Sequence, residues 1–382
     1  MISRNSVGGK YPVVTLGTVV DFLDSKRRPV TESERKAGPY PYYGANGLQG
    51  TIDGYIFDEP LVLLAEDGGH FGAPERGIAY RVSGKTWVNN HAHVIRPKAG
   101  LDLAYLCRVL ENYDVSPFVT GTTRGKLTKA GAADIPIPVA PLPEQRRIAA
   151  ILDQADALRA KRREALAQLD SLTQSIFVGM FGDPATNSKN WKTRPLLEGC
   201  DEINDCPHST PAWTDAGLVC LRTSNLTEGG WNWSDTRYVS ETTFHERSKR
   251  GYVAAGDIVL SREGTVGIAA VVTSDMKVCM GQRLVQVRPS PSFLTSEFLL
   301  RHLLFVLSPK RIGQLMVGST SQHLNVKELK ALLIPLPPVA LQLEFSRISA
   351  TLERLKETTK NSLSELDSLF ASLQHRAFQG EL

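Results

Sequence analysis

Apolar residues recur at alternating intervals of three and four positions in two long stretches of the chain. In the first stretch these positions are Ile148, Ile151, Ala155, Leu158, Arg162, Ala165, Leu169, Leu172 and Ile176. In the second they are Phe345, Ile348, Leu352, Leu355, Thr359, Ser362, Leu366, Leu369 and Leu373. This spacing is typical of the seam of a left-handed coiled coil. No proline lies between Pro143, which a first helical turn tolerates, and Phe181. The first stretch therefore predicts a helix about 58 Å long, at about 1.5 Å per residue.

The two stretches are parts of one internal repeat. The tetrapeptide LDSL occurs at 169–172 and again at 366–369, a shift of 197 residues. The same shift aligns further positions: Pro138 with Pro335, Gln145 with Gln342, and GTTRGKL (121–127) with GSTSQHL (318–324). A chance tetrapeptide would not keep its register over so long a distance. The chain is therefore built as two copies of one architecture.

The two predicted helices pack either each on its own globular region or on each other. Both have a polar break at the same place in mid-helix, at Arg162 with Ala165 and at Thr359 with Ser362. Matched lengths and matched breaks favour packing on each other. A twofold relation between the copies would make the helices antiparallel, and the polar positions would then meet and fix the register.

The segments before the helices have a different pattern. Residues 11–140 and 191–337 contain short β-type runs punctuated by Gly, Asn and Asp, such as PLVLLAE (60–66) and GDIVLSR (256–262). Their openings, YPVVTL and WKTRPL, align with a shift of 180 residues, and their middles barely align. The helical scaffold was therefore kept in both copies while the globular parts diverged.

These patterns predict an α+β fold with a pseudo-twofold internal repeat. Two globular mixed α/β domains are joined by two long antiparallel coiled-coil helices. The predicted boundaries are 1–140 for the first globular domain, 141–183 for the first helix, 184–338 for the second globular domain and 339–382 for the second helix.

Composition adds little to this picture. A net charge of +4 permits nucleic-acid binding but does not by itself argue for it. The N-terminal residues have no apolar core typical of a signal peptide, and no stretch approaches about 18 apolar residues. The five cysteines are scattered, which favours free thiols in a reducing compartment. We expect a cytoplasmic protein.

Catalytic motifs are not evident. GTTRGKL has the wrong spacing for a phosphate-binding P-loop, and neither a glycine-rich loop for an adenosyl cofactor nor an Asn-Pro-Pro-aromatic motif occurs. His91 and His93 lie two residues apart, but no acidic or cysteine partner is evident for a metal site, and we interpret both as polar surface residues. We expect a non-catalytic chain without a metal of its own.

Four segments around the two predicted helices are the most distinctive: IPIPVAPLPEQRRIAAIL (135–152), LDSLTQSIFVGMFGD (169–183), IPLPPVALQLEFSRI (334–348) and LDSLFASLQHRAFQGEL (366–382). With them, the whole chain resembles the specificity subunit of type I restriction–modification systems. YPYYGANGLQGTID (40–53), WVNNHAHVIRP (87–97) and GDIVLSREGTVG (256–267) also look like phrases of that family's target-recognition domains. The first helix keeps the EQRRIA signature, whereas LQLEFS in the second keeps only Gln342.

The resemblance implies a subunit that reads double-stranded DNA and performs no chemistry. Each globular region, as a target-recognition domain, would bind one half of a bipartite, asymmetric target, and the helices would set the spacing. Two adenine-N6 methyltransferase (modification) subunits would dock on the helical regions, and two restriction/translocase subunits can join them. S-adenosylmethionine, ATP and Mg would belong to those partners, with no cofactor on this chain and no membrane partner.

Candidate DNA-binding residues can be ranked by their chemistry, because base edges and phosphates are contacted by basic, amide, hydroxyl and aromatic side chains. In the first globular region they are Tyr42, Tyr43, Asn46, His70, Asn89, Asn90, His91, Arg124 and Lys126. In the second they are Arg222, Ser224, Asn225, Arg262, Glu263, Gln282, Arg283, Ser321, Gln322, His323 and Lys327. The alternatives are an autonomous two-headed DNA-binding regulator without enzyme partners, and an enzyme whose site has no recognised motif.

Overall fold

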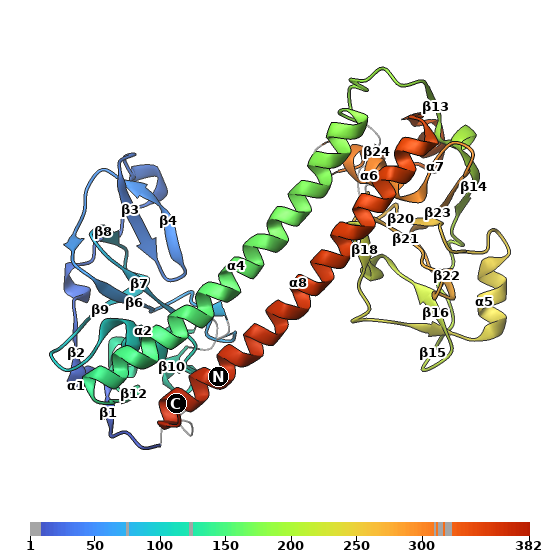
Figure 1. The fold of residues 1–382 in the computed structure, drawn as a ribbon. Helices are drawn as coiled ribbons and strands as arrows, with labels where there is room; N and C mark the ends of the chain where they lie inside the picture. Colours follow the sequence, from blue (N-terminus) through green and yellow to red (C-terminus); the bar gives the residue numbers. More distant parts are fainter. Residues whose placement is uncertain (1–8, 74–75, 122–124, 309–310, 312–315, 318–322) are drawn as a thin grey trace. The chain divides into compact units, whose positions relative to one another are not determined.

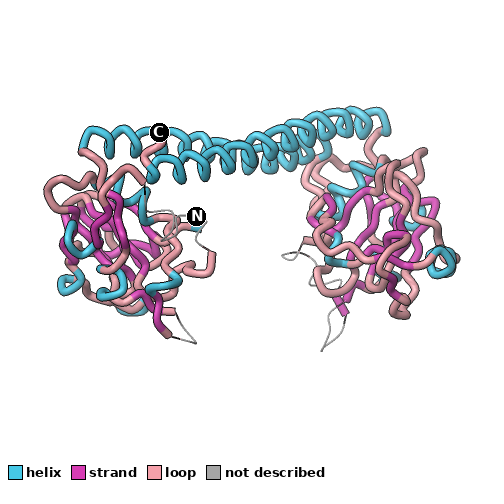
Figure 2. Tube along the Cα trace, turned by 90° about the horizontal axis from the view of Figure 1, so that it is seen from below, coloured by secondary structure: helices cyan, strands magenta, loops and turns pink. Residues whose placement is uncertain are grey.

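The computed structural model describes residues 9–73, 76–121, 125–308, 311, 316–317 and 323–382. It divides into two compact units, in which unit 1 is Met1–Glu164 with Lys360–Leu382 and unit 2 is Ala165–Thr359. Two long helices, α4 (Leu142–Phe181) and α8 (Val339–Gln379), each contribute one segment to each unit. Each unit therefore consists of a strand-rich head and two helix segments, which cover one side of that head (Figures 1 and 2).

Head 1 runs from β1 (Val13–Thr15) to β12 (Pro136–Pro138) and contains two four-stranded sheets. The first sheet is antiparallel with the order β2-β9-β6-β7, formed by Val20–Phe22, Ala92–Pro97, Leu61–Ala65 and Ala79–Val82. The second has the order β4-β3-β8-β5, with β3 and β8 parallel, formed by Gly47–Ile52, Tyr40–Gly44, Lys85–Val88 and Phe57–Asp58. The remaining elements include the ribbons β1–β12 and β10–β11 (Val119–Thr120, Lys126–Leu127) and the helices α1 (Leu16–Val19), α2 (Leu103–Leu110) and α3 (Lys129–Ala133).

Head 2 runs from β13 (Thr193–Pro195) to β26 (Leu333–Pro335) and repeats the first sheet strand for strand. That sheet has the order β14-β23-β20-β21, formed by Cys200–Asp205, Leu284–Pro289, Ile258–Ser261 and Ala269–Val271. A second sheet, β15-β19-β16-β22, again contains one parallel pair, β16 with β22; its strands are Trp213–Thr214, Tyr238–Val239, Leu218–Leu221 and Val278–Met280. The other elements are the ribbons β13–β26, β17–β18 (Leu226–Thr227, Gly230–Trp231) and β24–β25 (Met316–Val317, His323–Leu324) and the helices α5 (Glu241–Ser248), α6 (Ser296–Val306) and α7 (Val326–Ala331). The predicted fold class and internal repeat are confirmed.

The central strand of each first sheet is buried on both faces. In β6, Val62 and Leu64 pack into the core shared with the helices, while Leu61 and Leu63 pack into a core toward the second sheet. A strand that is covered on both faces needs a continuous apolar run rather than an alternating one. This explains the runs PLVLLAE and GDIVLSR in the sequence.

A buried glutamine fixes each helix to its head. Gln145 on α4 accepts a hydrogen bond from Asp102 N (2.7 Å) and donates to Gly100 O (2.9 Å) and Ala140 O (2.8 Å). Gln342 on α8 makes the equivalent set, accepting from Thr295 N (2.8 Å) and donating to two backbone carbonyls, Phe293 O (2.8 Å) and Pro337 O (2.9 Å). Each amide thus satisfies backbone groups that would otherwise be buried without partners.

The helix segments within each unit are antiparallel and joined by ion pairs. In unit 1, Arg159 Nε of α4 lies 2.6 Å from Asp367 Oδ1 of α8. In unit 2, Lys356 Nζ of α8 lies 2.9 Å from Asp170 Oδ1 of α4. Burial alone would lower the pKa of Lys356, but hydrogen bonds to Asp170 and Glu353 raise it. The 197-residue repeat relates Arg159 to Lys356 and Asp170 to Asp367, so the Asp of each LDSL copy pairs with the basic residue of the other copy.

The buried face of each long helix differs from the predicted seam at every second position. On α4 it follows the buried residues Ile148, Leu152, Ala155 and Thr173 and the half-buried residues Arg159, Leu166, Leu169, Ile176 and Met180. On α8 it follows the buried residues Phe345, Ser349, Lys356, Thr359, Phe370 and Ala377 and the half-buried residues Leu352, Leu363, Leu366 and Leu373. As a correction, the leucines predicted for the seam at Leu158, Leu172, Leu355 and Leu369 are 51%, 43%, 50% and 50% exposed. Ile151 and Ile348 are half-buried.

Polar side chains occupy several of these buried positions because their polar atoms have partners. Thr173 Oγ1 donates to Leu169 O at 3.0 Å, and Ser349 Oγ donates to Glu297 Oε1 at 2.7 Å. The guanidinium of Arg159 lies 4.3 Å from the centre of the Phe370 ring. A hydrophobicity pattern assigns such residues to the surface, which is why it selected the neighbouring leucines instead.

Two further expectations concern thiols and membranes. All five cysteines are free, and four of them are buried. Within the described part of the chain, no helix combines the length and the apolar character needed to cross a bilayer.

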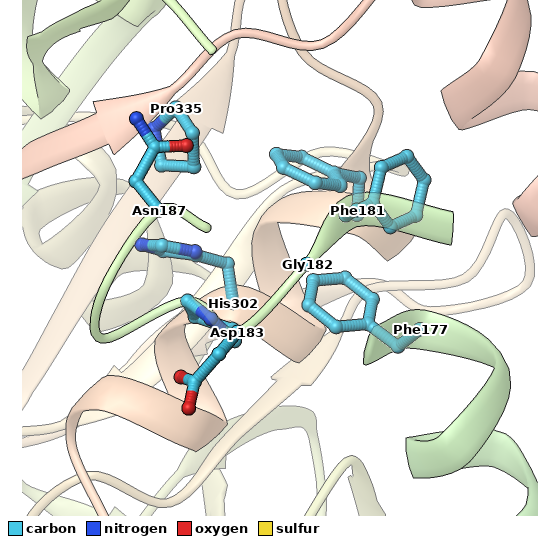
Figure 3. A pocket seen from close by; sticks show the side chains of 9 residues that line it. Phe177, Phe181, Gly182, Asp183, Asn187, His302 and Pro335 are labelled. Atoms are coloured by element: carbon cyan, nitrogen blue, oxygen red, sulfur yellow. The ribbon is translucent and has the colours of Figure 1, made fainter. Parts of the chain in front are cut away.

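His302 on α6 is buried in unit 2 beside a pocket lined by Phe177, Phe181, Asn187 and Pro335 (Figure 3). The pocket is too narrow to hold a water molecule. Nε2 of His302 has no hydrogen-bond partner among the described residues. Burial lowers the pKa of His302 to about 4, so the ring is neutral at pH 7.

The buried face predicts that the same substitution lowers the free energy of unfolding by different amounts at two leucines of α4. Leu152→Ala should lower the free energy of unfolding by about 2–4 kcal/mol, because Leu152 is fully buried. Leu158→Ala should cost about 0.5 kcal/mol or less, because Leu158 is half exposed. Urea unfolding followed by circular dichroism measures both. Equal losses would show that the buried face passes through Leu158.

The depressed pKa of His302 predicts acid sensitivity of unit 2. An unfolded histidine titrates near pH 6.5, whereas His302 in the folded protein titrates near pH 4. The free energy of unfolding is therefore highest above pH 6.5 and falls as the pH is lowered toward 4. The loss at pH 4 should be about 2–3 kcal/mol, and His302→Phe should abolish this part of the pH dependence. Tryptophan fluorescence follows it, since four of the five tryptophans lie in unit 2. Replacing the exposed His245 with Gln is the control, and an unchanged profile in His302→Phe would contradict the assignment.

Candidate nucleic-acid interface

Several strand ends meet at one edge of head 1. The end of β6 and the start of β9 are neighbours because these strands are antiparallel, and β3 and β8 end together because they are parallel (Figure 1). The residues that follow or precede these ends therefore gather at this edge. They are the segments 44–46, 66–68 and 89–91, which contain four of the predicted DNA-binding residues, Asn46, Asn89, Asn90 and His91.

Hydrogen bonds connect these segments into what we call the head 1 polar cluster, formed by Asn46, Asp67, Asn89, His91 and Lys126. Asn46 Nδ2 donates to Gly68 O at 2.9 Å, and His91 N donates to Asn89 Oδ1 at 2.8 Å. The His91 ring is hydrogen-bonded to the Asp67 carboxylate. Asp67 also forms a β-bridge with Lys126. The fold thus brings Asn46, Asn89, His91 and Lys126 together.

A group of more deeply buried charged residues, Asp24, Arg27, Glu66 and His93, lies next to this cluster. His93 is 1% exposed, and its Nδ1 lies 2.7 Å from Asp24 Oδ2 and 3.7 Å from Glu66 Oε2. Arg27 and Lys126 reach Glu66 at 2.6 and 3.0 Å. Burial alone would raise the pKa of Asp24 and of Glu66, but His93 lowers that of Asp24 and the two basic side chains lower that of Glu66. Both carboxylates are therefore ionised at neutral pH.

The interpretation of His91 and His93 as surface residues without acidic partners is corrected by this geometry, because the His91 ring bonds Asp67 and His93 is buried beside Asp24. Asp24, Glu66 and His93 have potential ligand atoms within 4.8 Å of one another. The ring nitrogens of His93 are already engaged, however, Nδ1 with Asp24 and Nε2 with Leu127 O at 2.8 Å. Arg27 and Lys126 also compensate the carboxylate charge. These residues form a closed ionic network that fixes the segment around Leu127 to the sheet.

The equivalent edge of head 2 contains a second group, the head 2 polar cluster of Asp205, Arg262, Glu263, Gln282 and Arg283. Arg262 NH1 lies 2.5 Å from Asp205 Oδ2, and Arg283 Nε lies 3.3 Å from Glu263 Oε2. Gln282 Nε2 donates to the backbone carbonyl of His208, whose ring lies 3.4 Å from Asp205. Four predicted residues, Arg262, Glu263, Gln282 and Arg283, are thus brought together.

Some predicted residues have partners inside the protein. Tyr42 is buried, and its hydroxyl exchanges hydrogen bonds of 3.0 Å with the backbone of Val30. Asn225 is buried, and its Oδ1 accepts from Arg222 N at 2.9 Å, which closes a turn. Asn89 is also buried and donates to Gln49 Oε1 at 3.1 Å. These three side chains shape the edge rather than present a face to a ligand.

The other predicted residues lie at or near the two edges, with one exception. Tyr43 is half-buried against Tyr80, His70 is half-buried in the loop after β6, and Asn90 is exposed. Arg222 forms an ion pair of 2.6 Å with Asp235, and Ser224 is exposed in the same turn. Lys327 on α7 lies apart, in a groove of about 550 Å³. Outside the described residues lie Arg124, Ser321, Gln322 and the side chain of His323.

Sequence reasoning missed the acidic members of both clusters, Asp67 and Asp205, and the supporting residues Asp24, Arg27 and Glu66. A ranking by DNA-contacting chemistry favours basic and amide groups and passes over carboxylates. A signal was present, because EDG at 66–68 and REG at 262–264 both follow a buried strand at nearly the repeat spacing. The pairing of Asp67 with His91 and of Asp205 with Arg262 is visible only in the fold.

Comparisons with known proteins agree with this architecture. Residues 9–168 and 222–367 match the family model described as the type I restriction modification DNA specificity domain. The chain is 30% identical over 373 residues to the putative type I restriction enzyme specificity subunit S.HindORF215P of Haemophilus influenzae, covering 92% of this chain and 88% of that protein. It is 24% identical over 431 residues to the type I restriction enzyme EcoKI specificity subunit of Escherichia coli, with 98% and 90% covered.

A solved structure shares the fold. The crystal structure of the type I restriction–modification system S subunit from M. genitalium superimposes with a TM-score of 0.62 at 14% identity, covering 97% of this chain and 96% of that one. Two matched specificity domains and the near full-length relative together establish the family. The chain therefore belongs to the DNA specificity subunits of type I restriction–modification systems.

Proposed function

We propose that this chain recognises a bipartite, asymmetric DNA target, with one half-site read by head 1 and the other by head 2. The observation that carries the proposal is that both heads keep the same first sheet but hold different polar side chains at its equivalent edge. Two like scaffolds with unlike surface chemistry suit two unlike half-sites. Gln145 and Gln342 support the proposal, because each fixes a head to a long helix through a matched set of hydrogen bonds.

The chain acts in this proposal as a non-catalytic subunit. The two helical regions dock two adenine-N6 methyltransferase subunits, and restriction subunits join them in the full enzyme. S-adenosylmethionine, ATP and Mg belong to those partners. Family membership supports this assignment, and so does the chemistry at the two edges, where the polar groups are engaged in ion pairs and amide hydrogen bonds. The cytoplasm, where DNA is accessible, is the proposed location.

Co-expression with a cognate methyltransferase tests the proposal. The expected product is a stable complex of one chain with two methyltransferase subunits that methylates adenine in one bipartite motif, mapped by sequencing of methylated DNA. The purified chain alone should bind DNA weakly and methylate nothing with added S-adenosylmethionine. Methylation or cleavage by the isolated chain would contradict the non-catalytic role. Specific binding without any association with the methyltransferase would support the autonomous regulator instead.

A domain exchange tests the assignment of one half-site to each head. Replacing residues 11–137 with the corresponding region of another specificity subunit should change one half of the methylated motif and leave the other half unchanged. The reciprocal exchange of residues 191–334 is the matched control and should change only the other half. A single exchange that alters both halves would refute the independence of the two heads.

A further inference from the structure

The backbone identifies positions of the two heads that correspond to each other, although their sequences barely align. Glu66 N donates to His91 O at 2.8 Å, and Arg262 N donates to Arg283 O at 2.9 Å. The carbonyls of the same two donors then accept from the ribbon that follows, Leu127 N to Glu66 O and Leu324 N to Arg262 O, both at 2.8 Å. His91 of head 1 and Arg283 of head 2 therefore occupy one position of the fold.

An acidic residue is paired with the basic side chain at that position in each head. Asp67 follows Glu66 and binds the His91 ring, while Glu263 follows Arg262 and lies 3.3 Å from Arg283 Nε. The next residue is a glycine with positive φ in both heads, Gly68 at 65° and Gly264 at 75°. The turn that positions the acid is thus the same in both heads. The basic member differs, a histidine in one and an arginine in the other.

The basic side chain is the more exposed member of each pair. The side chain of Arg283 is 59% exposed and that of Glu263 is 28% exposed, while His91 and Asp67 are 39% and 18% exposed. The carboxylate therefore lies beneath the basic group and can hold it in place while the basic group faces solvent. A neighbouring carboxylate also repels phosphate, which disfavours a phosphate-binding role and leaves the donors for a base edge.

The backbone of Arg283 gives an independent indication. Three non-glycine residues in the described part of the chain have positive φ, and two of them are asparagines, which tolerate this conformation. The third is Arg283, with φ of 67°. Residues held in such sparsely populated conformations cluster at functional sites, because the surrounding structure must compensate the strain. Here the strained residue bears the most exposed basic group of the cluster.

We propose that Arg283 is a specificity-determining residue that reads one guanine in the half-site bound by head 2, and that Glu263 is its positioning residue. His91, positioned by Asp67, reads the equivalent base pair of the other half-site. Guanidinium donors match the O6 and N7 acceptors of guanine in the major groove, whereas an imidazole offers a single hydrogen bond. One position with two different side chains then makes the half-sites unlike. This inference rests on the proposed DNA-recognition function.

The test uses the full chain in complex with its cognate methyltransferase and a DNA library with both half-sites randomised. Methylated adenines are sequenced, and the preference at each base pair is calculated. Arg283→Gly suits the positive φ, so its Tm should not fall below that of the unmodified chain. Its preference for guanine at one base pair should fall about 10- to 100-fold, with the other half-site unchanged. Arg283→Lys should lose most of the same preference while keeping the charge.

Variants of the acid separate positioning from folding. Glu263→Gln should weaken the preference at the same base pair by about 3- to 10-fold, and Glu263→Asp should restore most of it, because a carboxylate is again present. Glu241 on α5 supplies the control, since its side chain is 78% exposed and Glu241→Gln changes the net charge equally. That control should leave every base preference unchanged. His91→Gln should change one base pair of the opposite half-site only.

Different failures have different meanings. If the unmodified complex shows no sequence preference, the proposed function itself is refuted. If the unmodified complex reads two half-sites but Arg283→Gly and Arg283→Lys retain every preference, the role of Arg283 is refuted and the proposed function stands. A change in both half-sites, or a Tm lowered by more than about 5 °C in Arg283→Gly, would make the effect of Arg283 structural and would also overturn the inference.

Discussion

A buried glutamine amide joins each head to its long helix, together with the apolar core that the head and the helix segments share. Gln145 and Gln342 each bond three backbone groups, of which one carbonyl, Ala140 O or Pro337 O, lies where the head connects to the helix and the other two groups lie within the head. An apolar residue at either position would leave these groups buried and unpaired, at a cost of about 1–3 kcal/mol for each group. This requirement explains why Gln342 persists in the second helix although the surrounding signature does not. The glutamine therefore helps to fix the position of each head on its helix.

The repeated LDSL tetrapeptide has a specific role in the pairing of the two helices. Its first leucine lies on the buried face in both copies, and its aspartate forms an ion pair with the basic residue of the other copy. Because the segments are antiparallel, the motif forms this ion pair once in each unit. Ion pairs with exposed carboxylates contribute little free energy, so their value lies in register and orientation.

The two heads show how one scaffold can be kept while its surface chemistry changes. Backbone hydrogen bonds fix the strand order and the turn after the central strand, and they do not depend on side-chain identity. Asp24 of head 1 forms an ion pair with Arg27 and a hydrogen bond with His93, whereas Asp205 of head 2 forms an ion pair with Arg262. Compensation of charge beneath the edge is therefore achieved by different residues in each head. The side chains at the edge can therefore differ between the two heads, as long as the charges of the groups buried beneath them remain compensated.

The sequence by itself determined the repeat, the two long helices and the strand-rich character of the heads, because periodicity and a conserved register report local structure directly. Only the tertiary structure decided which helix positions are buried, since Thr173, Ser349 and Lys356 are buried through partners that a hydropathy pattern does not include. The tertiary structure also determined which residues form the polar clusters. Asp67 meets His91, and Glu263 meets Arg283, because neighbouring antiparallel strands bring together residues about 20 positions apart. Such non-local pairing follows from strand order, which the spacing of residues along the chain does not specify.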